Sequence, residues 1–178
     1  MKLFKFIPFL ALFIFTSCNT VRVASDYDRE ANFTEYNSFA FYKPGIDKAK
    51  ISDLDKKRIL RAIEAEMTAK GMSKSKTPTL LVSIFTKEKN RIDVYNNNYG
   101  YGWGWNPYWY GGYYGSTVST STEGSLYIDL IDVKTNALVW QGLGTADLVT
   151  GSMEKKEQRI REIVGKILAV YPPGSNTK

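Results

Sequence analysis

The clearest pattern along the chain is an apolar stripe close to its C-terminal end. Its members recur mostly at intervals of three and four residues: Ile160, Ile163, Val164, Ile167, Leu168 and Tyr171. This spacing is typical of an amphipathic helix that packs one face on a hydrophobic core. We expect the helix to begin at Ser152 and to end before Pro172-Pro173, because proline cannot continue a helix.

A second helix is predicted over residues 53–70. Ser52, followed three residues later by Asp55, approximates a capping box, whose side chains bind free backbone N–H groups at a helix start. Gly71 suits the C-terminal end, where the backbone often turns left-handed. Charged residues fill one face, and the apolar residues at helical spacing on the other are Ile59, Leu60, Ile63 and Met67.

Five segments read as strands, because β-branched and aromatic residues are concentrated in them or alternate with polar ones. They span residues 21–28, 38–42, 79–86, 117–133 and 137–148. The third could continue through the charged sequence that follows it. In the fourth, Leu126, Ile128 and Leu130 alternate toward one face, and Gly124 is expected to form a bulge or bend. In the fifth, Trp140 is assigned to the core.

The order of these elements indicates the fold class. Short turns between strands favour an antiparallel sheet, and helices with one apolar face must bury that face against it. The sequence therefore predicts an α+β two-layer sandwich, with an antiparallel sheet of about four to six strands and two helices packed on one face. We expect a single domain over residues 21–173, followed by a disordered tail at residues 174–178.

The first 17 residues are typical of an export signal. Two lysines precede an apolar run over residues 7–15, which is about half as long as a membrane-spanning helix needs to be. The sequence Phe15-Thr16-Ser17-Cys18 then resembles the lipobox of bacterial lipoproteins, although leucine is commoner than phenylalanine at its first position. We therefore expect residues 1–17 to be removed.

Cys18 is the only cysteine in the chain, so it has no disulfide partner within it. Acylation of Cys18 would explain an unpaired cysteine in an exported protein. The alternative is a soluble secreted protein whose cleavage site contains a cysteine. We expect a short acylated N-terminus over residues 18–20 that is held in a membrane, since each buried methylene contributes about 0.8 kcal/mol. Asn19 and the lack of an acidic run after Cys18 favour the periplasmic face of the outer membrane.

Charge argues against a nucleic-acid partner. The formal net charge is +6, and loss of the two lysines in residues 1–17 leaves +4. The basic residues are spread along the chain rather than clustered in the stripe that nucleic-acid binding usually shows.

The residues that perform most enzyme chemistry are scarce. The chain contains no histidine and one cysteine, which removes the commonest general base and transition-metal ligand as well as thiolate zinc sites. Asp26, Asp28 and Glu30 could bind a hard cation, but solvated charges at a strand end explain them better. We expect Asp129 to be exposed and Asp132 to stabilise a turn. The sequence predicts no catalytic residue, metal or cofactor, and a carboxylate-based hydrolase is the less favoured class.

Short motifs also appear along the chain in a characteristic order. They are Asp26-Tyr27-Asp28, Phe33, the stretch from Tyr36 to Phe41, Lys70-Gly71, residues 132–142, and Tyr171-Pro172-Pro173. In this order they resemble the bacterial envelope lipoproteins grouped as the domain of unknown function 4136 family, over nearly all of the mature chain. Phe41 stands where many relatives carry tryptophan. The family has no established catalytic residues, so the resemblance implies a fold and an envelope location, not an activity.

The most unusual part of the chain is residues 95–116, in which ten of 22 residues are aromatic, six are glycine and none is charged. Three interpretations stay open: a contact surface, a tip that touches the membrane, or a structural or disordered connection. The candidate binding residues are Tyr99, Tyr101, Trp103, Trp105, Tyr108, Trp109, Tyr110, Tyr113 and Tyr114.

These observations predict a non-enzymatic, membrane-anchored envelope lipoprotein that acts as a structural or interaction module. Its partners would be the membrane, through Cys18, and an envelope protein or a glycan, through the aromatic stretch. A lipoprotein that binds peptidoglycan or another polysaccharide is the alternative.

Overall fold

The structure is a computed structural model that describes residues 21–95, 117–147 and 151–174. Four predictions lie outside these ranges: the export signal over residues 1–17, the lipidation of Cys18, the disorder of the tail beyond Gly174, and the nine candidate binding residues between Tyr99 and Tyr114.

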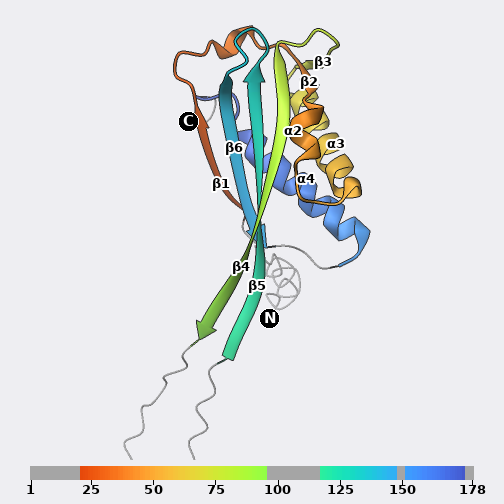
Figure 1. Cartoon of the computed structure of the whole chain (residues 1–178), viewed down its shortest axis with the longest axis vertical. Coiled ribbons are helices and arrows are strands. Elements are labelled where there is room, and N and C mark those ends of the chain that lie inside the picture. Colours follow the sequence, from red (N-terminus) through yellow and green to blue (C-terminus); the bar gives the residue numbers. More distant parts are fainter. Residues whose placement is uncertain (1–20, 96–116, 148–150, 175–178) are drawn as a thin grey trace, which may run out of the picture.

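A six-stranded sheet forms the centre of the fold, with the strand order β1-β6-β5-β4-β2-β3 (Figure 1). Its strands are β1 (Arg22–Tyr27), β2 (Ser38–Phe41), β3 (Ser73–Lys74), β4 (Leu80–Tyr95), β5 (Thr117–Asp132) and β6 (Leu138–Asp147). Antiparallel pairing joins β1 to β6, β6 to β5 and β5 to β4. The third predicted strand does continue through the charged sequence that follows it, because β4 ends only at Tyr95.

The sheet is mixed, so the expectation of a purely antiparallel sheet is wrong. β2 runs parallel to both of its neighbours, β4 and β3. A parallel pair needs a crossover connection of a dozen or more residues, and helix α3 (Asp53–Ala69) lies in the connection between β2 and β4. The α+β class is confirmed by the six strands and the two long helices.

The two long helices, α3 and α4 (Met153–Ala169), lie side by side along one side of the sheet (Figure 1). Each begins with a serine cap: Ser52 Oγ accepts from the Asp55 N–H at 3.1 Å, and Ser152 Oγ accepts from the Lys155 N–H at 3.4 Å. Gly71 has a φ of +85°, the left-handed conformation expected at the end of α3. Among the residues described, no helix is long and apolar enough to cross a bilayer.

The core lies between the sheet and the helices. Trp140 and Phe39 are fully buried there, and so is the apolar stripe of α4 at Ile167. Tyr171 lies beyond the end of α4, yet its ring packs edge-on against Trp140 with 5.3 Å between ring centroids. The alternation predicted for β5 is confirmed, because its alternate apolar residues are all buried: Leu126, Ile128 and Leu130.

Two local features differ from the sequence-based expectations. A short helix, α2 (Lys43–Asp47), begins two residues after β2 ends at Phe41, and the alternation does not reveal it. Pro44 is tolerated in its first turn because no backbone N–H is needed there. Of the bulge or bend expected at Gly124, the bulge is absent, since β5 pairs in continuous register with both neighbours through this residue. The register shift lies between Leu130 and Ile131, beside the turn that follows β5.

Candidate functional site: a hairpin arm and the cleft at its base

β4 and β5 are longer than the rest of the sheet and continue beyond it. β6 ends at Asp147, which pairs with Glu123 of β5. Beyond this pair, β4 and β5 are paired only with each other among the described residues, over residues 90–95 and 117–122, which we call the arm. At about 3.4 Å per residue the arm extends the sheet by roughly 20 Å. Figure 1 shows the arm extending away from the part of the sheet that lies beside the helices.

The aromatic stretch connects the two strands of the arm. Tyr95 pairs with Thr117, so residues 96–116 leave and re-enter the sheet at the same point. Tyr95 itself is the last residue of β4. The candidate binding residues within the stretch lie outside the described ranges, and their role stays a prediction.

A cleft of about 320 Å³ opens at the base of the arm, between the sheet and the N-terminal halves of α3 and α4. Its volume lies at the lower end of the roughly 300–1,000 Å³ that small-molecule sites occupy. Its walls are mainly apolar and include Ile51, Ile59, Leu126, Ile160 and Ile163. The cleft is therefore suited to an apolar group of modest size.

Two side chains bring buried polar atoms to the wall of this cleft. Arg159 is 8% exposed and donates from Nη1 to Glu162 Oε2 at 2.7 Å. The hydroxyl of Thr86 is buried and has no hydrogen-bond partner within the described part of the chain. The sequence holds a signal for Arg159, which lies four residues before Ile163 and hence on the apolar face of α4. It also holds one for Thr86, which lies two residues after Ile84 and hence on the buried face of β4.

An ion-pair network beside the cleft joins the two helices. Asp55 Oδ2 of α3 accepts from Lys156 Nζ of α4 at 2.8 Å, and Asp55 Oδ1 accepts from Arg58 Nη1 at 2.7 Å. Burial acts to raise the pKa of Asp55, but hydrogen bonds from Lys156, Ser52 and Arg58 outweigh it and hold that pKa below its ordinary value. The carboxylate stays ionised and connects α3 to α4 rather than acting as an acid.

The carboxylates near the N-terminus are engaged locally. Asp26 Oδ1 accepts from the Tyr27 N–H and Asp28 Oδ1 accepts from the Glu30 N–H, each at 2.9 Å. Nowhere in the three described ranges do three or more potential metal ligands gather at one point.

Asp129 is half-buried, so the expectation that it is exposed is wrong. Gln141 Nε2 donates to Asp129 Oδ1 at 2.7 Å. Burial raises the pKa of Asp129, and the bond from Gln141 offsets only part of this effect. Gln141 also pairs with Asp26, so the two carboxylates lie two strands apart, with about 10 Å between their backbones. Neighbouring strands cover a side chain that alternation alone places in solvent.

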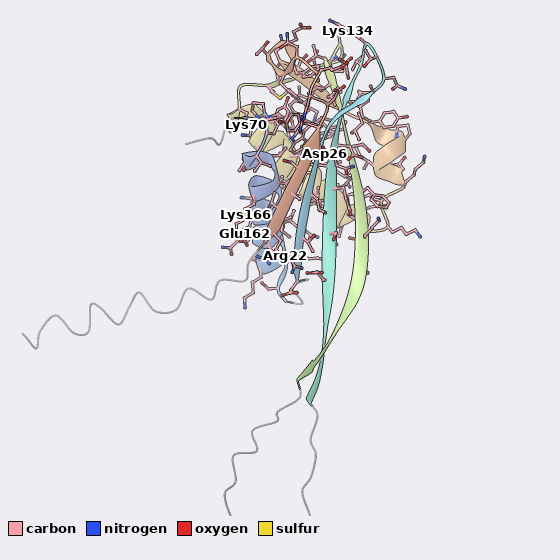
Figure 2. All side chains as sticks on the ribbon, turned by 90° about the vertical axis from the view of Figure 1, so that its left-hand side faces the viewer. Arg22, Asp26, Lys70, Lys134, Glu162 and Lys166 are labelled. Atoms are coloured by element: carbon pink, nitrogen blue, oxygen red, sulfur yellow. The ribbon has the colours of Figure 1, made fainter. Side chains whose placement is uncertain are left out.

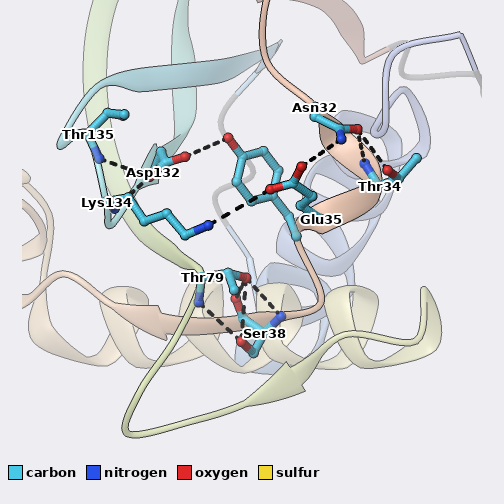
Figure 3. Close-up of polar contacts among 9 residues, drawn as sticks. Asn32, Thr34, Glu35, Ser38, Thr79, Asp132, Lys134 and Thr135 are labelled. Atoms are coloured by element: carbon cyan, nitrogen blue, oxygen red, sulfur yellow. Dashed lines mark hydrogen bonds and ion pairs between the residues drawn. The ribbon is translucent and has the colours of Figure 1, made fainter.

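At the end of the sheet away from the arm, Asp132 stabilises the turn between β5 and β6, as predicted (Figure 3). Asp132 Oδ1 accepts from the N–H groups of Lys134 at 2.6 Å and Thr135 at 3.1 Å, and Oδ2 accepts from the Tyr36 hydroxyl at 2.8 Å. Burial acts to raise the pKa of Asp132, but these hydrogen bonds outweigh it and lower that pKa. Burial and the bond to Asp132 raise the pKa of Tyr36 to about 12.

We expect Asp132→Asn to reduce the free energy of unfolding at pH 7 by about 1 kcal/mol, because water weakens charge-assisted hydrogen bonds at a partly exposed site. A carboxyl group with a lowered folded pKa stabilises the fold above its unfolded pKa of about 3.9, and this stabilisation disappears as the pH falls through the folded pKa. The difference between wild type and variant should therefore shrink in urea titrations as the pH falls below about 4. Tyr36→Phe, which removes one of the three bonds, is the control. A difference that stays constant with pH would contradict this role of the charge.

Comparisons with known proteins describe the chain at the level of family and fold. The sequence profile of a family described as "Domain of unknown function (DUF4136)" matches residues 23–173. No curated protein matches the sequence significantly.

Several solved structures are similar in fold, and two serve as examples. One is a PDZ domain protein from Parabacteroides distasonis, with a TM-score of 0.53 and 16% sequence identity over 86% of this chain and 36% of that one. The other is a PelC dodecamer from Paraburkholderia phytofirmans, with a TM-score of 0.51 and 13% identity over 84% of this chain and 96% of that one. This chain thus spans about a third of the first protein and nearly all of the second. At these identities the likeness shows a shared fold alone.

Proposed function

The chain belongs to the DUF4136 family, and on this premise we propose that it is a non-enzymatic, lipid-anchored envelope protein that uses its arm as a contact surface. The observation that carries the proposal is the register of β4 and β5, which continue as an arm after β6 has ended. The anchor would be the acyl group on Cys18, at the periplasmic face of the outer membrane. An envelope protein or a glycan would be the partner of the aromatic stretch.

The uncovered state of the arm supports a contact role. A two-stranded hairpin is marginally stable by itself in water, and third strands or packed helices normally stabilise it. Within the described ranges neither covers the arm, since β6 ends at Asp147 and the helices lie beside the main part of the sheet (Figure 1). A partner surface would supply the missing contacts.

The composition of the connecting stretch supports the same role. Tyrosine and tryptophan provide large, rigid contact areas with a polar group, and glycine lets a loop adapt to its partner. Flat rings also stack on sugars, so a glycan strand is an alternative partner to a protein. The residues that would make this contact are Tyr99, Tyr101, Trp103, Trp105, Tyr108, Trp109, Tyr110, Tyr113 and Tyr114.

The state of the carboxylates supports a non-enzymatic role. Asp55 and Asp132 are ionised acceptors that connect structural elements, and Asp129 accepts a hydrogen bond from Gln141. A carboxylate-based hydrolase would need two such groups facing each other across a substrate.

Replacement of residues 96–116 by Asn-Gly tests the contact role. Because Tyr95 and Thr117 are paired, a two-residue turn can close the arm without a change of register. We expect the variant to keep its melting temperature within about 2 °C, which corresponds to less than roughly 1 kcal/mol in a chain of this size. It should lose cross-links from a photoreactive residue placed at Asn90, and any sedimentation with purified peptidoglycan.

The matched control keeps the length of the stretch and replaces its three tryptophans, Trp103, Trp105 and Trp109, by serine. Loss of contact in both variants assigns it to the aromatic rings. Unchanged cross-linking and sedimentation in both variants would overturn the contact role, whereas loss of sedimentation alone would identify the glycan as the partner.

A further inference from the structure

The start of β1 and the base of the arm lie at the same end of the sheet. Arg22, the first residue of β1, pairs with Thr145 of β6, which pairs with Ser125 of β5, which pairs with Lys87 of β4. The guanidinium of Arg22 also forms an ion pair with Glu123. Figure 2 shows Arg22 at the end of the sheet from which β4 and β5 continue downward, and Lys134 at the opposite end.

The strand directions place the preceding residues on the side of the arm. β1 is antiparallel to β6 and β6 is antiparallel to β5, so β1 runs in the same direction as β5. β5 starts in the arm at Thr117. The chain before Arg22 therefore enters the domain from the end at which the arm projects.

The tether to a lipid anchor on Cys18 is short compared with the arm. Val21 is buried, so only three residue steps separate the anchor from the fixed part of the domain, at most about 11 Å. From the row of Lys87 to Tyr95, β4 continues for roughly 27 Å. If the arm pointed away from the membrane, β1 alone would place about 17 Å of sheet between Arg22 and the bilayer, which the tether cannot span. The arm must therefore lie along the membrane surface or reach into it, because it is longer than the tether.

The sheet face at the base of the arm carries side chains that suit a lipid headgroup region. Phe85, which is 43% exposed, and Tyr127 have ring centroids 5.7 Å apart, and Lys87 Nζ lies 5.6 Å from each centroid. Lys87 forms no ion pair among the described residues. Ser125 and Thr145 hydrogen-bond to each other at 3.2 Å, which places the row from Lys87 to Arg22 on one face. Aromatic rings beside basic groups are typical of residues at a membrane interface.

We propose that the arm and the patch formed by Arg22, Phe85, Lys87 and Tyr127 dock on the headgroup region of the membrane that holds Cys18, so that the bilayer itself is a partner of this end of the domain. The inference rests on the proposed lipid anchor. It identifies lipid, rather than a glycan strand distant from the membrane, as the surface against which the arm lies. The aromatic stretch has no charged residue, so it is compatible with a lipid surface.

Position relative to the bilayer can be measured in the lipidated full-length protein, reconstituted in vesicles of phosphatidylethanolamine and phosphatidylglycerol. A fluorophore is attached at Thr120→Cys in the arm or at Thr135→Cys in the turn at the opposite end, and a lipid-borne quencher is added. Cys18 does not react, because its sulfur carries the lipid. We expect at least a twofold stronger quenching at position 120 than at position 135 on the basis of the arm lengths above. Equal quenching at both positions, or stronger quenching at position 135, would overturn the proposal.

A separate experiment tests whether Cys18 carries the proposed lipid anchor. Metabolic labelling with a radioactive fatty acid should label the wild type and leave Cys18→Ser unlabelled. Without labelling of the wild type the proposed anchor itself is wrong, whatever the quenching shows.

The chemistry of the patch is tested by charge reversal in the chain that lacks its acyl group. Vesicle flotation of Lys87→Glu is compared with that of Lys134→Glu, a matched reversal at the far end of the sheet, where the lysine is 81% exposed. We expect Lys87→Glu to weaken partitioning at least about fivefold, because one basic residue near an anionic surface contributes about 1 kcal/mol, and Lys134→Glu to have little effect. Equal effects of both reversals, or binding to peptidoglycan without binding to vesicles, would contradict docking on lipid.

Discussion

Replacement of Trp140 by alanine is expected to lower the free energy of unfolding by about 3–5 kcal/mol, the range typical of a large aromatic side chain removed from a core. Trp140 is fully buried and packs edge-on against Tyr171, whose ring also contacts Phe33 with 6.0 Å between centroids. Its loss leaves a cavity between β6 and the segment after α4. In a chain of this size the melting temperature should fall by roughly 6–20 °C, which calorimetry or thermal circular dichroism measures.

The matched control is Trp140→Phe. The Trp140 Nε1–H is buried and has no hydrogen-bond partner in the part of the chain that the structure describes. Phenylalanine keeps an aromatic edge against Tyr171 and removes that unpaired donor, so its cost should be well below that of alanine. A melting temperature of Trp140→Ala within about 2 °C of wild type would show that the core does not depend on this ring.

Gly142→Ala is expected to destabilise the protein by about 1–3 kcal/mol through overpacking. A Cβ at Gly142 would lie 2.3 Å from Cη2 of Trp140 and 2.5 Å from Cγ2 of Ile167. Both neighbours are fully buried, so neither can move aside freely. Urea unfolding should show a lower midpoint with an unchanged slope, which indicates reduced stability without a change in compactness.

Gly165→Ala is the control for this substitution. Gly165 lies in α4, and an added Cβ would meet only the end of the Glu66 side chain, 3.3 Å away. Alanine in a helix is favoured over glycine by up to about 1 kcal/mol, so the control should be neutral or stabilising. Equal losses of stability at both positions would indicate that the contacts around Gly142 are not the cause.

These roles explain the motif over residues 132–142 in structural terms. Asp132 binds the N–H groups of a turn, Trp140 fills the core, and Gly142 leaves room for Trp140 and Ile167. The motif that carries the family resemblance therefore specifies a hairpin and its packing. This is why it identifies the fold without indicating an activity.

The helices could be predicted from the sequence because the signals for them are local. The spacing of apolar residues and the serine caps at Ser52 and Ser152 depend on neighbours within one or two turns. The parallel pairing of β2 could not be predicted in this way. An alternating strand has the same pattern in parallel and antiparallel sheets, and the choice follows from the crossover through α3.

Some parts of the candidate site could be predicted from the sequence, and others could not. The sequence located the aromatic stretch between two strands, and its lack of charge and histidine argued against acid-base chemistry there. The burial of Asp129, the hydroxyl of Thr86 in the cleft and the contact of Lys87 with Tyr127 depend on side chains from other strands and helices. Residues so distant in sequence leave no periodic signal of their proximity.

The sequence by itself determined the two amphipathic helices, the strand segments and the position of the aromatic stretch, because these follow from propensity and periodicity over a few residues. Only the tertiary structure decided the mixed sheet, the length of the arm beyond β6 and the entry of the chain at Arg22 beside the base of the arm. The physical reason is that register and strand direction are set by hydrogen bonds between segments far apart in the chain, which local patterns do not encode.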